Sequence, residues 1–484
     1  MQLHWHRRDL RVADNRGLAT AAEAGPVAPL FVFDRDVLDH AGAPRVRYLL
    51  DALSELRDAY RERGSDLLVA RGDPRTVVPA VAAALDAERA VWGIDYSGLA
   101  RERDADVRLA LDEAGVAREP VHDAIFHPPG SITTNAGDTY SVYTYFWKKW
   151  HDRDKPDPYP EPDADDLADA ATLESAAQDL TNGDAEFDIA VGGLPTISDL
   201  GFEEPSASVQ SAGTEAARER LSAFCADAIY RYADDRDYPT RDATSRLSTD
   251  LKFGTIGIRE VYAATAAARE GVGGERDESV EEFQSQLAWR EFYAHVLREH
   301  PNVVTENYKE YEEDIAWRDD DEELAAWKAG ETGYPIVDAG MRQLREEAYM
   351  HNRVRMIVAS FLTKDLLCDW RHGYAHFREH LADHDTANDN GGWQWAASTG
   401  TDAQPYFRIF NPMTQGERYD PDGEYIKRYV PELSDVTANT IHEWHELTDL
   451  ERERLAPDYP EPIVDHAERR ERAISMFEAA RGDD

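Results

Sequence analysis

The hydrophobic pattern changes along the chain, and this change separates regions of different fold class. In residues 1–130, short apolar runs alternate with amphipathic stretches. The runs predict buried strands, and the stretches between them predict helices. The expected strands lie at 3–7, 28–34, 66–72 and 90–96, and the expected helices at 45–64 and 73–87. Strands that alternate with helices are typical of a doubly wound parallel sheet, so we expect an α/β domain over 1–130.

From residue 215 onward the apolar residues follow helical spacing, and no strand pattern is seen. The expected helices lie at 215–233, 257–270, 278–300, 321–329, 335–347, 349–370, 372–381, 393–398 and 464–480. We therefore expect residues 215–484 to form an all-α domain with its pocket between helices. Residues 131–214 are acidic, with no Lys or Arg from Pro156 to Ala217, and we expect them to be an interdomain linker.

The composition limits the protein classes that are possible. With 96 acidic and 53 basic residues the net charge is −43, which by itself argues against a nucleic-acid partner. The same charge fits a high-salt cytoplasm, where salt screens charges strongly and an acidic surface stays hydrated. A DNA partner must then be judged from local arginine clusters rather than from the total charge.

Cysteine and histidine usage exclude some cofactors. Two cysteines, Cys225 and Cys368, cannot make a four-thiolate cluster, and we expect buried free thiols. His372, His376 and His380 fit one face of an ordinary helix, so we expect no metal site. No window is apolar enough to span a membrane, and the start MQLHWHRRDLR has no apolar signal region. We expect a cytoplasmic monomer with no membrane partner.

The stretch from Asp383 to Asn411, DHDTANDNGGWQWAASTGTDAQPYFRIFN, combines unusual features. Two aspartates stand at i,i+2, and a Gly-Gly pair lets the backbone approach something flat or bulky. Trp393 and Trp395 follow directly. Composition alone leaves open whether this is a binding segment or a loop that leads into a core helix.

Three further stretches carry polar and aromatic groups at regular spacing. TSRLS (244–248) fits an anion cradle around Arg246 or the cap of a helix. QLAWREFY (286–293) puts polar and aromatic groups on one helix face, where an indole stacks on a flat ligand or packs in a core. MHNRVRM (350–356) fits a phosphate-binding face or a solvated basic surface.

Together these strings resemble the DNA photolyase and cryptochrome family, most closely class I-type cyclobutane pyrimidine dimer photolyases of a halophilic, haloarchaeal-like kind. The start WHRRDLRVADNRGL (5–18) resembles the antenna domain of that family. The resemblance implies light-driven repair of pyrimidine dimers by reduced FAD, on damaged DNA whose dimer is flipped out of the duplex. It also implies a second antenna chromophore, a folate or a deazaflavin. Asp95 to Gly98 follow the fourth expected strand, where open α/β sheets bind ligands or simply form an edge loop.

The resemblance also assigns roles to individual residues. FAD would be bound by Tyr232, Thr244, Ser245, Arg246, Leu247, Ser248, Gln286, Arg355, Asp383, His384, Asp385 and Asp389. DNA would be contacted by Arg236, Trp289, Arg290, Asn352, Arg353, Met356, Trp395 and Gln415. The catalytic residues would be Gln286, Trp289, Asn352 and Asp389, and the electron relay would be Trp317, Trp370 and Trp393. We expect Arg236, Arg290, Arg353 and Arg355 to form one basic pocket in an acidic shell.

Two positions depart from the family pattern. Gln286 stands where many photolyases have Glu, and it keeps hydrogen-bonding capacity but has no proton to give. Asp389 stands where most photolyases have Asn, and burial would raise the pKa of its carboxyl. Both departures favour an alternative, a cryptochrome-type blue-light receptor without repair activity. The intact MHNRVRM string favours cyclobutane dimers over (6-4) products as the substrate.

Overall fold

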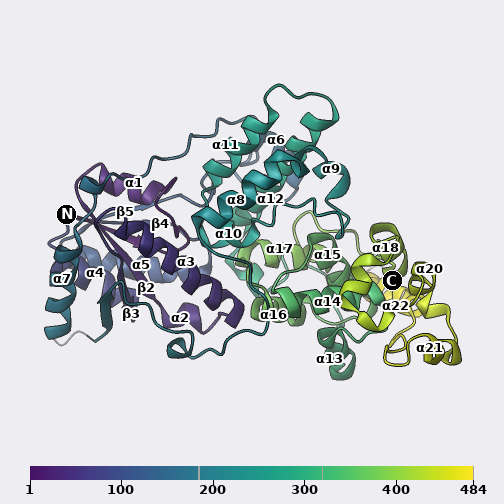
Figure 1. The fold of residues 1–484 in the computed structure, drawn as a ribbon. Coiled ribbons are helices and arrows are strands. Elements are labelled where there is room, and N and C mark those ends of the chain that lie inside the picture. Colours follow the sequence, from purple (N-terminus) through teal and green to yellow (C-terminus); the bar gives the residue numbers. More distant parts are fainter. Residues whose placement is uncertain (184–185, 319, 483–484) are drawn as a thin grey trace.

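The computed structural model describes residues 1–183, 186–318 and 320–482 and shows an α/β domain beside a helical domain (Figure 1). The sheet has the strand order β5-β4-β1-β2-β3-β6. Its strands are β1 Gln2–His6, β2 Val27–Phe33, β3 Leu68–Arg71, β4 Arg89–Gly93, β5 Ala117–Val121 and β6 Asp188–Val191. The ladders from β5 to β3 are parallel, and only β6 runs antiparallel, along β3. The predicted parallel doubly wound sheet is confirmed.

Helices cover both faces of this sheet. They are α1 Arg16–Ala22, α2 Arg35–Leu38, α3 Ala43–Arg61, α4 Pro74–Ala84 and α5 Gly98–Glu113. Helix α4 begins where the Asp-Pro pair predicts, because the Asp73 side chain accepts a hydrogen bond from the Arg75 amide and Pro74 needs no partner. Strands β1 and β2 are buried along their whole length, and β3 and β4 are buried except at their ends, which explains their largely apolar sequences.

The acidic segment 131–214 contains more structure than the expected linker. Helix α6, Tyr143–His151, packs on the helical domain, and helix α7, Ala170–Asn182, packs on α4. Strand β6 pairs with β3 and extends the sheet. The acidic residues of α7 lie on its outer face, while Leu173, Ala176 and Ala177 are buried. The average composition therefore hid an amphipathic helix.

The second domain is helical, and no strand occurs in its described residues, 215–318 and 320–482, as predicted. Its first helices are α8 Thr214–Ala226, α9 Tyr232–Asp235, α10 Ser248–Phe253, α11 Ile258–Arg269, α12 Glu275–Glu299 and α13 Asp321–Ala329. They are followed by α14 Pro335–Glu347, α15 Asn352–Ser360, α16 Trp370–His380, α17 Thr386–Ala396, α18 Pro412–Tyr419 and α19 Glu424–Tyr429. The last are α20 Ala438–His442, α21 Asp449–Leu455 and α22 His466–Ala480.

Three predicted helix boundaries are wrong. The helix expected at 215–233 breaks after Ala226, and the helix expected at 349–370 ends in a π-helical turn, Phe361–Asp365. Leu367 then adopts a left-handed φ of 58°, and α16 starts anew behind its cap Asp369. The segment expected to be helical only at 393–398 is helical from Thr386, because Asp385 accepts hydrogen bonds from two amides of the first turn.

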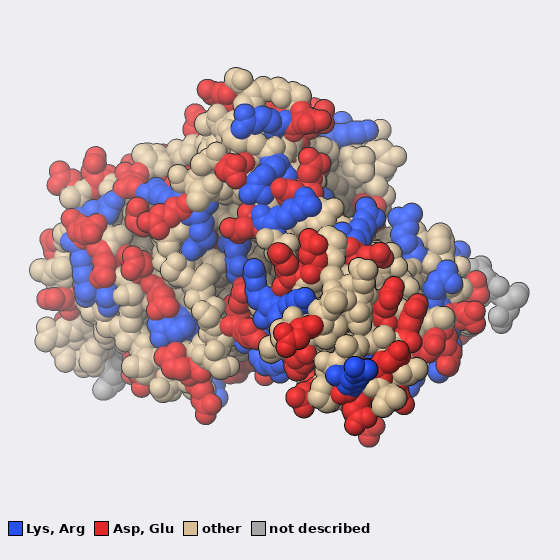
Figure 2. Space-filling model, turned by 45° about the vertical axis from the view of Figure 1, so that its right-hand side comes forward, with Lys and Arg blue, Asp and Glu red and all other residues tan. Residues whose placement is uncertain are grey.

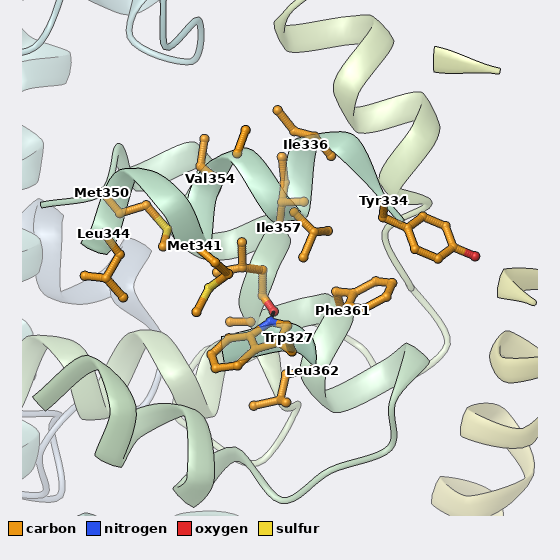
Figure 3. Packing of buried hydrophobic residues seen from close by; sticks show 14 of the residues in the cluster. Trp327, Tyr334, Ile336, Met341, Leu344, Met350, Val354, Ile357, Phe361 and Leu362 are labelled. Carbon is orange, nitrogen blue, oxygen red and sulfur yellow. Dashed lines mark hydrogen bonds between the residues drawn. The ribbon is translucent and has the colours of Figure 1, made fainter. Parts of the chain in front are cut away.

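Two apolar cores support this domain, one centred on α14–α17 and one on α8, α11 and α12. The indole of Trp327 lies fully buried among side chains from α14, α15 and the π-helical turn (Figure 3). Its Nε1 donates a hydrogen bond to the Val358 carbonyl over 3.1 Å. Cys368 is buried as predicted, whereas Cys225 is only half-buried. No helix in the described part of the chain combines the length and apolar character that a membrane span requires.

A buried polar network joins the two domains. Arg259 of α11 forms ion pairs with Asp14 and Asp123 of the α/β domain, and Arg11 also pairs with Asp123. All four side chains are almost completely buried. Buried charges that satisfy each other in this way are costly to separate. The network therefore fixes the orientation of the α/β domain on the helices that carry the candidate site.

Candidate functional site

The centre of the candidate site lies between α15 and α17. Arg355 Nη2 donates to Asp383 Oδ2 over 2.7 Å, and its Nη1 lies 3.6 Å from Asp389 Oδ1. Asp389 Oδ2 accepts a hydrogen bond of 2.7 Å from the Asp385 amide. One guanidinium thus faces two buried carboxylates, and Asp383, Asp385 and Asp389 come together as predicted.

The pKa values of these carboxyl groups diverge. Burial, together with the charge of Asp383, raises the pKa of Asp389 to about 7, against the opposing charge of Arg355. This confirms the expected direction. Burial alone would raise the pKa of Asp385 as well, but the charges of Arg8 and Lys252 lower it overall. At neutral pH the site therefore holds one firmly ionised carboxylate and one that exchanges its proton.

Two buried polar atoms in this centre have no hydrogen-bond partner among the described residues. Asp383 Oδ1 and His384 Nε2 are both fully covered and make no hydrogen bond, although His384 Nε2 lies 4.0 Å from Asp389 Oδ2. Burial lowers the pKa of His384, so its ring is neutral. Buried groups of this kind normally find a hydrogen-bond partner. They mark a place where the hydroxyl and amide groups of a bound ligand would fit.

The segment 244–248 leads into α10, and Arg246 and Arg355 lie over the same ring, that of Tyr349. Arg246 has a left-handed φ of 51°, a conformation that costs a non-glycine residue about 1–3 kcal/mol and is found mostly at functional sites. Its Nη2 donates to Glu347 over 2.9 Å, and its guanidinium stacks 4.1 Å above the Tyr349 ring. None of the three hydroxyl groups caps α10. Thr244, Ser245 and Ser248 are therefore not used as the helix cap, which was the alternative interpretation.

Helix α12 brings its predicted face to the site. The Trp289 indole stacks on Tyr143 of α6 with ring centroids 3.7 Å apart and planes 11° apart. Gln286 Nε2 donates to Glu282 Oε1 over 3.1 Å, and Glu282 in turn pairs with Arg236. Arg236 also lies over the buried Tyr232 ring, 5.6 Å from its centroid. These contacts join two of the predicted motifs, 232–236 and 286–293.

The opposite end of this face meets α17 at a glycine. A Cβ at Gly391 would lie 2.2 Å from the Tyr293 ring, so only glycine permits this approach of the two helices. The Gly-Gly pair therefore has a packing role at its first position. At Gly392, by contrast, an added Cβ would meet nothing.

A second pocket lies between the two domains. It is lined by Arg8, Asp95, Tyr96, Ala124, Ile125, Arg290, Ala294, Leu297 and residues 385–388. Arg290 donates to the carbonyls of Ala124 and Leu251 over 2.6 and 2.9 Å. Arg8 forms ion pairs with Asp95 and Asp385. The loop after the fourth strand thus faces the start of α17.

The prediction that four arginines form a single basic pocket is wrong. Arg290 faces the interdomain pocket and is held by backbone carbonyls. The other three arginines each face a carboxylate: Arg236 pairs with Glu282, Arg353 with Asp237 and Arg355 with Asp383. Three of these four cations thus have a carboxylate as counter-charge. On the face in Figure 2, basic and acidic side chains alternate over both domains.

The remaining predicted DNA contacts differ in their exposure. Asn352 is exposed, with its Nδ2 3.9 Å from Met356 Sδ. Arg353 stacks 4.4 Å above Tyr419, and Trp395 lies against Phe410 with ring centroids 6.5 Å apart. Gln415 on α18 has a buried Oε1 without a partner among the described residues. These side chains come from α15, α17 and α18, which surround the site.

The three predicted relay tryptophans lie in or against the same apolar core of the helical domain. Trp393 and Trp370 are buried, and a Cβ at Gly373 of α16 would lie 2.0 Å from the Trp393 ring. Trp370 contacts Tyr374, while Trp317 is partly buried against Phe477. No direct ring contact joins any two of the three among the described residues. Trp370 and Trp393 lie where α16 meets α17, and the segment of Trp317 is hydrogen-bonded to the turn before α16, because the Arg318 amide donates to the Leu367 carbonyl over 2.7 Å.

Sequence reasoning missed several residues of the site. Tyr143 lies in a segment taken for linker, although its aromatic string YTYFWKKW was a usable signal. Arg8 and Lys252 were not singled out, yet both act on the pKa of Asp385. Glu282 and Glu347 were missed as well, since partners of arginines cannot be identified from spacing alone.

Comparison with known proteins agrees with this geometry. A family model described as DNA photolyase matches residues 2–163, and one described as FAD binding domain of DNA photolyase matches residues 283–479. A deoxyribodipyrimidine photo-lyase of Halobacterium salinarum is 63% identical over 496 residues, covering 100% of both chains. That of a Synechococcus species is 41% identical, covering 98% of this chain and 96% of the relative.

A solved structure of similar sequence has the same fold. The class III photolyase of Agrobacterium tumefaciens superposes with a TM-score of 0.86 at 34% identity, covering 99% of this chain and 97% of that one. Because these identities extend over the full length, they assign the α/β domain, the FAD-binding domain and the site between them to the same family. The chain belongs to the DNA photolyase family.

Proposed function

We propose that this protein repairs cyclobutane pyrimidine dimers in DNA in a light-driven reaction that uses reduced FAD. The full-length, 63% identity with the deoxyribodipyrimidine photo-lyase of Halobacterium salinarum carries this proposal. Each chain is covered completely, so neither lacks a domain that the other has. The site geometry supports the same reaction.

The donors and acceptors present fit FAD. Arg246, with the hydroxyls of Thr244, Ser245 and Ser248, would hold the pyrophosphate, and Tyr232 and Leu247 would line that end. Asp383, with its unpaired Oδ1, would accept from ribityl hydroxyls, and Arg355, His384, Asp385, Asp389 and Gln286 would surround the ring system. When bound in reduced form, FAD supplies the light-driven electron donation that splits the cyclobutane ring.

The protein's own side chains would bind and orient the substrate. Trp289 offers one face of its indole to a flipped-out dimer, and Tyr143 holds the other face in place. Gln286 and Asn352 present amide groups that hydrogen-bond base edges. Arg236, Arg353, Met356, Trp395 and Gln415 would contact the DNA around the dimer. Arg290 would act from the interdomain side, through Ala124 and Leu251, rather than on DNA.

A cryptochrome-type receptor is the second candidate function. Gln286 and Asp389 favour it, since a carboxyl with a pKa of about 7 beside the ring system changes which redox state is stable. A Synechocystis cryptochrome has the same fold with a TM-score of 0.87, but at 24% identity this similarity concerns the fold alone.

We also propose that the interdomain pocket holds a second, antenna chromophore. Its place after the fourth strand and its charged lining, Arg8, Asp95 and Arg290, fit a flat anionic or amide-bearing ring system. A folate and a deazaflavin both meet this description. An archaeal photolyase from Sulfolobus tokodaii, 31% identical with a TM-score of 0.80, is described with two FAD molecules that imply a novel light-harvesting cofactor. The absorption spectrum of the purified protein, read beyond the flavin bands, distinguishes these chromophores.

The tryptophans Trp317, Trp370 and Trp393 are proposed to carry an electron from the surface toward the oxidised flavin. The close approach of α16 to Trp393 at Gly373 supports its second step. Replacing Trp393 by Phe should slow photoreduction of the bound flavin, because Phe is much harder to oxidise. A wild-type photoreduction rate in that variant would remove Trp393 from the path. A monomeric state and a cytoplasmic location remain predictions, and size-exclusion chromatography checks the first.

Illumination tests the main proposal. Reduced, FAD-loaded protein is mixed in high salt with a duplex that holds one thymine dimer, and half of the sample stays dark. Loss of the dimer in the light alone supports repair. Retention of the dimer with FAD bound and photoreducible would favour the receptor.

A further inference from the structure

The last turn of α16 brings together three groups that commonly bind transition metals. His376, Glu379 and His380 each offer one ligand atom, and these atoms lie within 4.8 Å of one another. The two imidazole rings stand at i,i+4 with centroids 4.3 Å apart, and His380 Nε2 lies 3.9 Å from Glu379 Oε2. The string HFREH has the spacing H-x-x-E-H, in which two histidines of one helix face share a metal.

These ligands are available and mostly neutral. Burial lowers the pKa of His376 to about 3, and the ring of His380 and the charges of Lys328 and Arg345 act in the same direction. Burial likewise lowers the pKa of His380. No hydrogen bond to either imidazole is found within the described ranges, and His376 packs edge-on against Trp327 with ring centroids 5.6 Å apart. A neutral imidazole with a free nitrogen is the form that coordinates a metal.

The backbone of this turn is already fixed. A Cβ at Gly42 would lie 1.8 Å from the Glu379 carbonyl, so the loop before α3 presses directly on the turn. Arg45 donates to the carbonyls of Arg378 and Leu381 from the α/β domain. Metal binding would therefore need only rotation of two side chains, those of Glu379, which is exposed, and His380, which is half-buried. Ligand atoms on a tetrahedral zinc ion stand about 3.4 Å apart, given bond lengths of about 2.1 Å.

We propose that His376, Glu379 and His380 form a binding site for one divalent transition-metal ion, with Zn²⁺ or Ni²⁺ as suitable occupants. Two imidazoles and a carboxylate select these ions over Mg²⁺ and Ca²⁺, which prefer oxygen ligands. Water would complete the coordination shell. The bound ion would lock the end of α16 where the two domains meet, and it lies outside the flavin and DNA sites. This proposal replaces the sequence-based expectation of an ordinary helix face.

Calorimetric titration of the full-length, FAD-loaded protein with Zn²⁺ tests the site. Because the surface carries many carboxylates, the titration is run in high salt with millimolar Mg²⁺, which occupies oxygen-only sites. We expect one Zn²⁺ per chain, with affinity reduced at least tenfold in His376→Gln and in His380→Gln. The matched control is His445→Gln, since His445 also stands beside a glutamate, Glu446, but belongs to no group of three possible metal ligands in the described residues.

Two outcomes would overturn the proposal. One is wild-type Zn²⁺ affinity in both variants, and the other is a loss in His372→Gln with none in His380→Gln. A Co²⁺ spectrum provides an independent measurement, because coordination by imidazoles gives visible d–d bands that surface carboxylates in water do not. Absence of these bands in the wild type would also contradict the site. The flavin absorption spectrum of each variant shows that it is folded.

Discussion

At the residue scale, Trp289 depends on a neighbour that no motif revealed. Tyr143 lies parallel to its indole at 3.7 Å, and the Tyr143 hydroxyl donates to the Ser285 carbonyl of the same helix over 2.5 Å. This arrangement fixes the indole before substrate arrives. A fixed ring loses less entropy on stacking with a base.

Replacing Trp289 by Ala should weaken binding of dimer-containing DNA by about 1–3 kcal/mol, the usual value of one stacked base. FAD should be retained, because the phosphate and ribityl contacts lie on other elements. Filter binding measures the DNA affinity, and the visible spectrum measures the flavin. Tyr143→Phe is the control and should bind nearly as well as wild type, since it keeps the stack. Unchanged affinity in the alanine variant would exclude substrate stacking by Trp289.

Asp389 predicts a pH dependence of stability. The folded protein holds its proton up to about pH 7, whereas an unfolded aspartate releases it near pH 4. The unfolded state therefore binds fewer protons between these values, and the contribution of Asp389 to stability falls as pH rises through this window.

Asp389→Asn removes this titration. Relative to wild type, the variant should gain on the order of 1–3 kcal/mol of unfolding free energy between pH 5 and pH 8. Denaturant titrations of both flavin-free proteins at the two pH values measure this gain. Comparing the variant with the wild type cancels the contribution of other groups, such as Glu291, since burial also raises the pKa of Glu291 to about 7. Parallel stability curves for the two proteins would show that Asp389 titrates normally.

The properties of a single residue could be predicted where they depend on one side chain within a motif. The raised pKa of Asp389 follows from a carboxyl placed on a buried helix, and sequence suggested it. The ion pairs of Arg236, Arg353 and Arg355 did not follow, because their partners lie up to 116 positions away along the chain. Only the folded chain shows that these cations are already neutralised.

At the scale of elements, glycines set the distance between helices. Gly373 of α16 faces the Trp393 ring so closely that a Cβ would lie 2.0 Å from it. Trp393 in turn packs against Phe377 and Trp327, with ring centroids 5.0 and 6.0 Å apart. The ring therefore fills a space that α16 leaves open only at this position.

Gly373→Ala should destabilise the protein, because overpacking a core usually costs roughly 1–3 kcal/mol. The gain in helix propensity, about 1 kcal/mol, offsets only part of this cost. Gly392→Ala in α17 is the matched control, since its Cβ would meet nothing and only the propensity gain remains. Denaturant unfolding of both flavin-free variants measures the effect. Stabilisation by Gly373→Ala would mean that the indole moves aside freely.

Elements with strong periodicity were predicted well, and the failures have physical causes. Helices α13 and α14 begin and end as expected, because caps and apolar spacing agree. The π-helical turn at Phe361–Asp365 was invisible, since its residues continue an apolar run while the backbone changes its hydrogen bonding. Strand β6 was missed because it is short, acidic at one end and formed only by pairing with β3.

At the scale of the whole molecule, an acidic surface surrounds a few buried arginine networks. The net charge of −43 repels itself, and added salt screens this repulsion because the Debye length falls to about 3 Å at 1 M. Buried pairs such as Arg259 with Asp14 are screened much less. Added salt should therefore stabilise the folded protein by screening repulsion at the surface, and it should not weaken the interdomain network.

We predict that the thermal unfolding midpoint rises by several degrees between 0.2 and 2 M KCl. Sucrose at matched water activity should reproduce only a minor part of the rise, because it does not screen charge. Differential scanning fluorimetry measures both series. A midpoint that falls with KCl would show that surface ion pairs, rather than repulsion, dominate the electrostatics.

We propose that this protein repairs pyrimidine dimers although it carries Gln286 and Asp389, the two residues that depart from the family pattern. The most direct measurement is dimer loss per absorbed photon in a duplex with one thymine dimer, for reduced wild type and for Trp289→Ala at saturating DNA. We predict light-dependent repair by the wild type, a dark control without loss, and a reduced yield in the variant. Absence of repair by DNA-bound, reduced wild type under illumination would contradict the account.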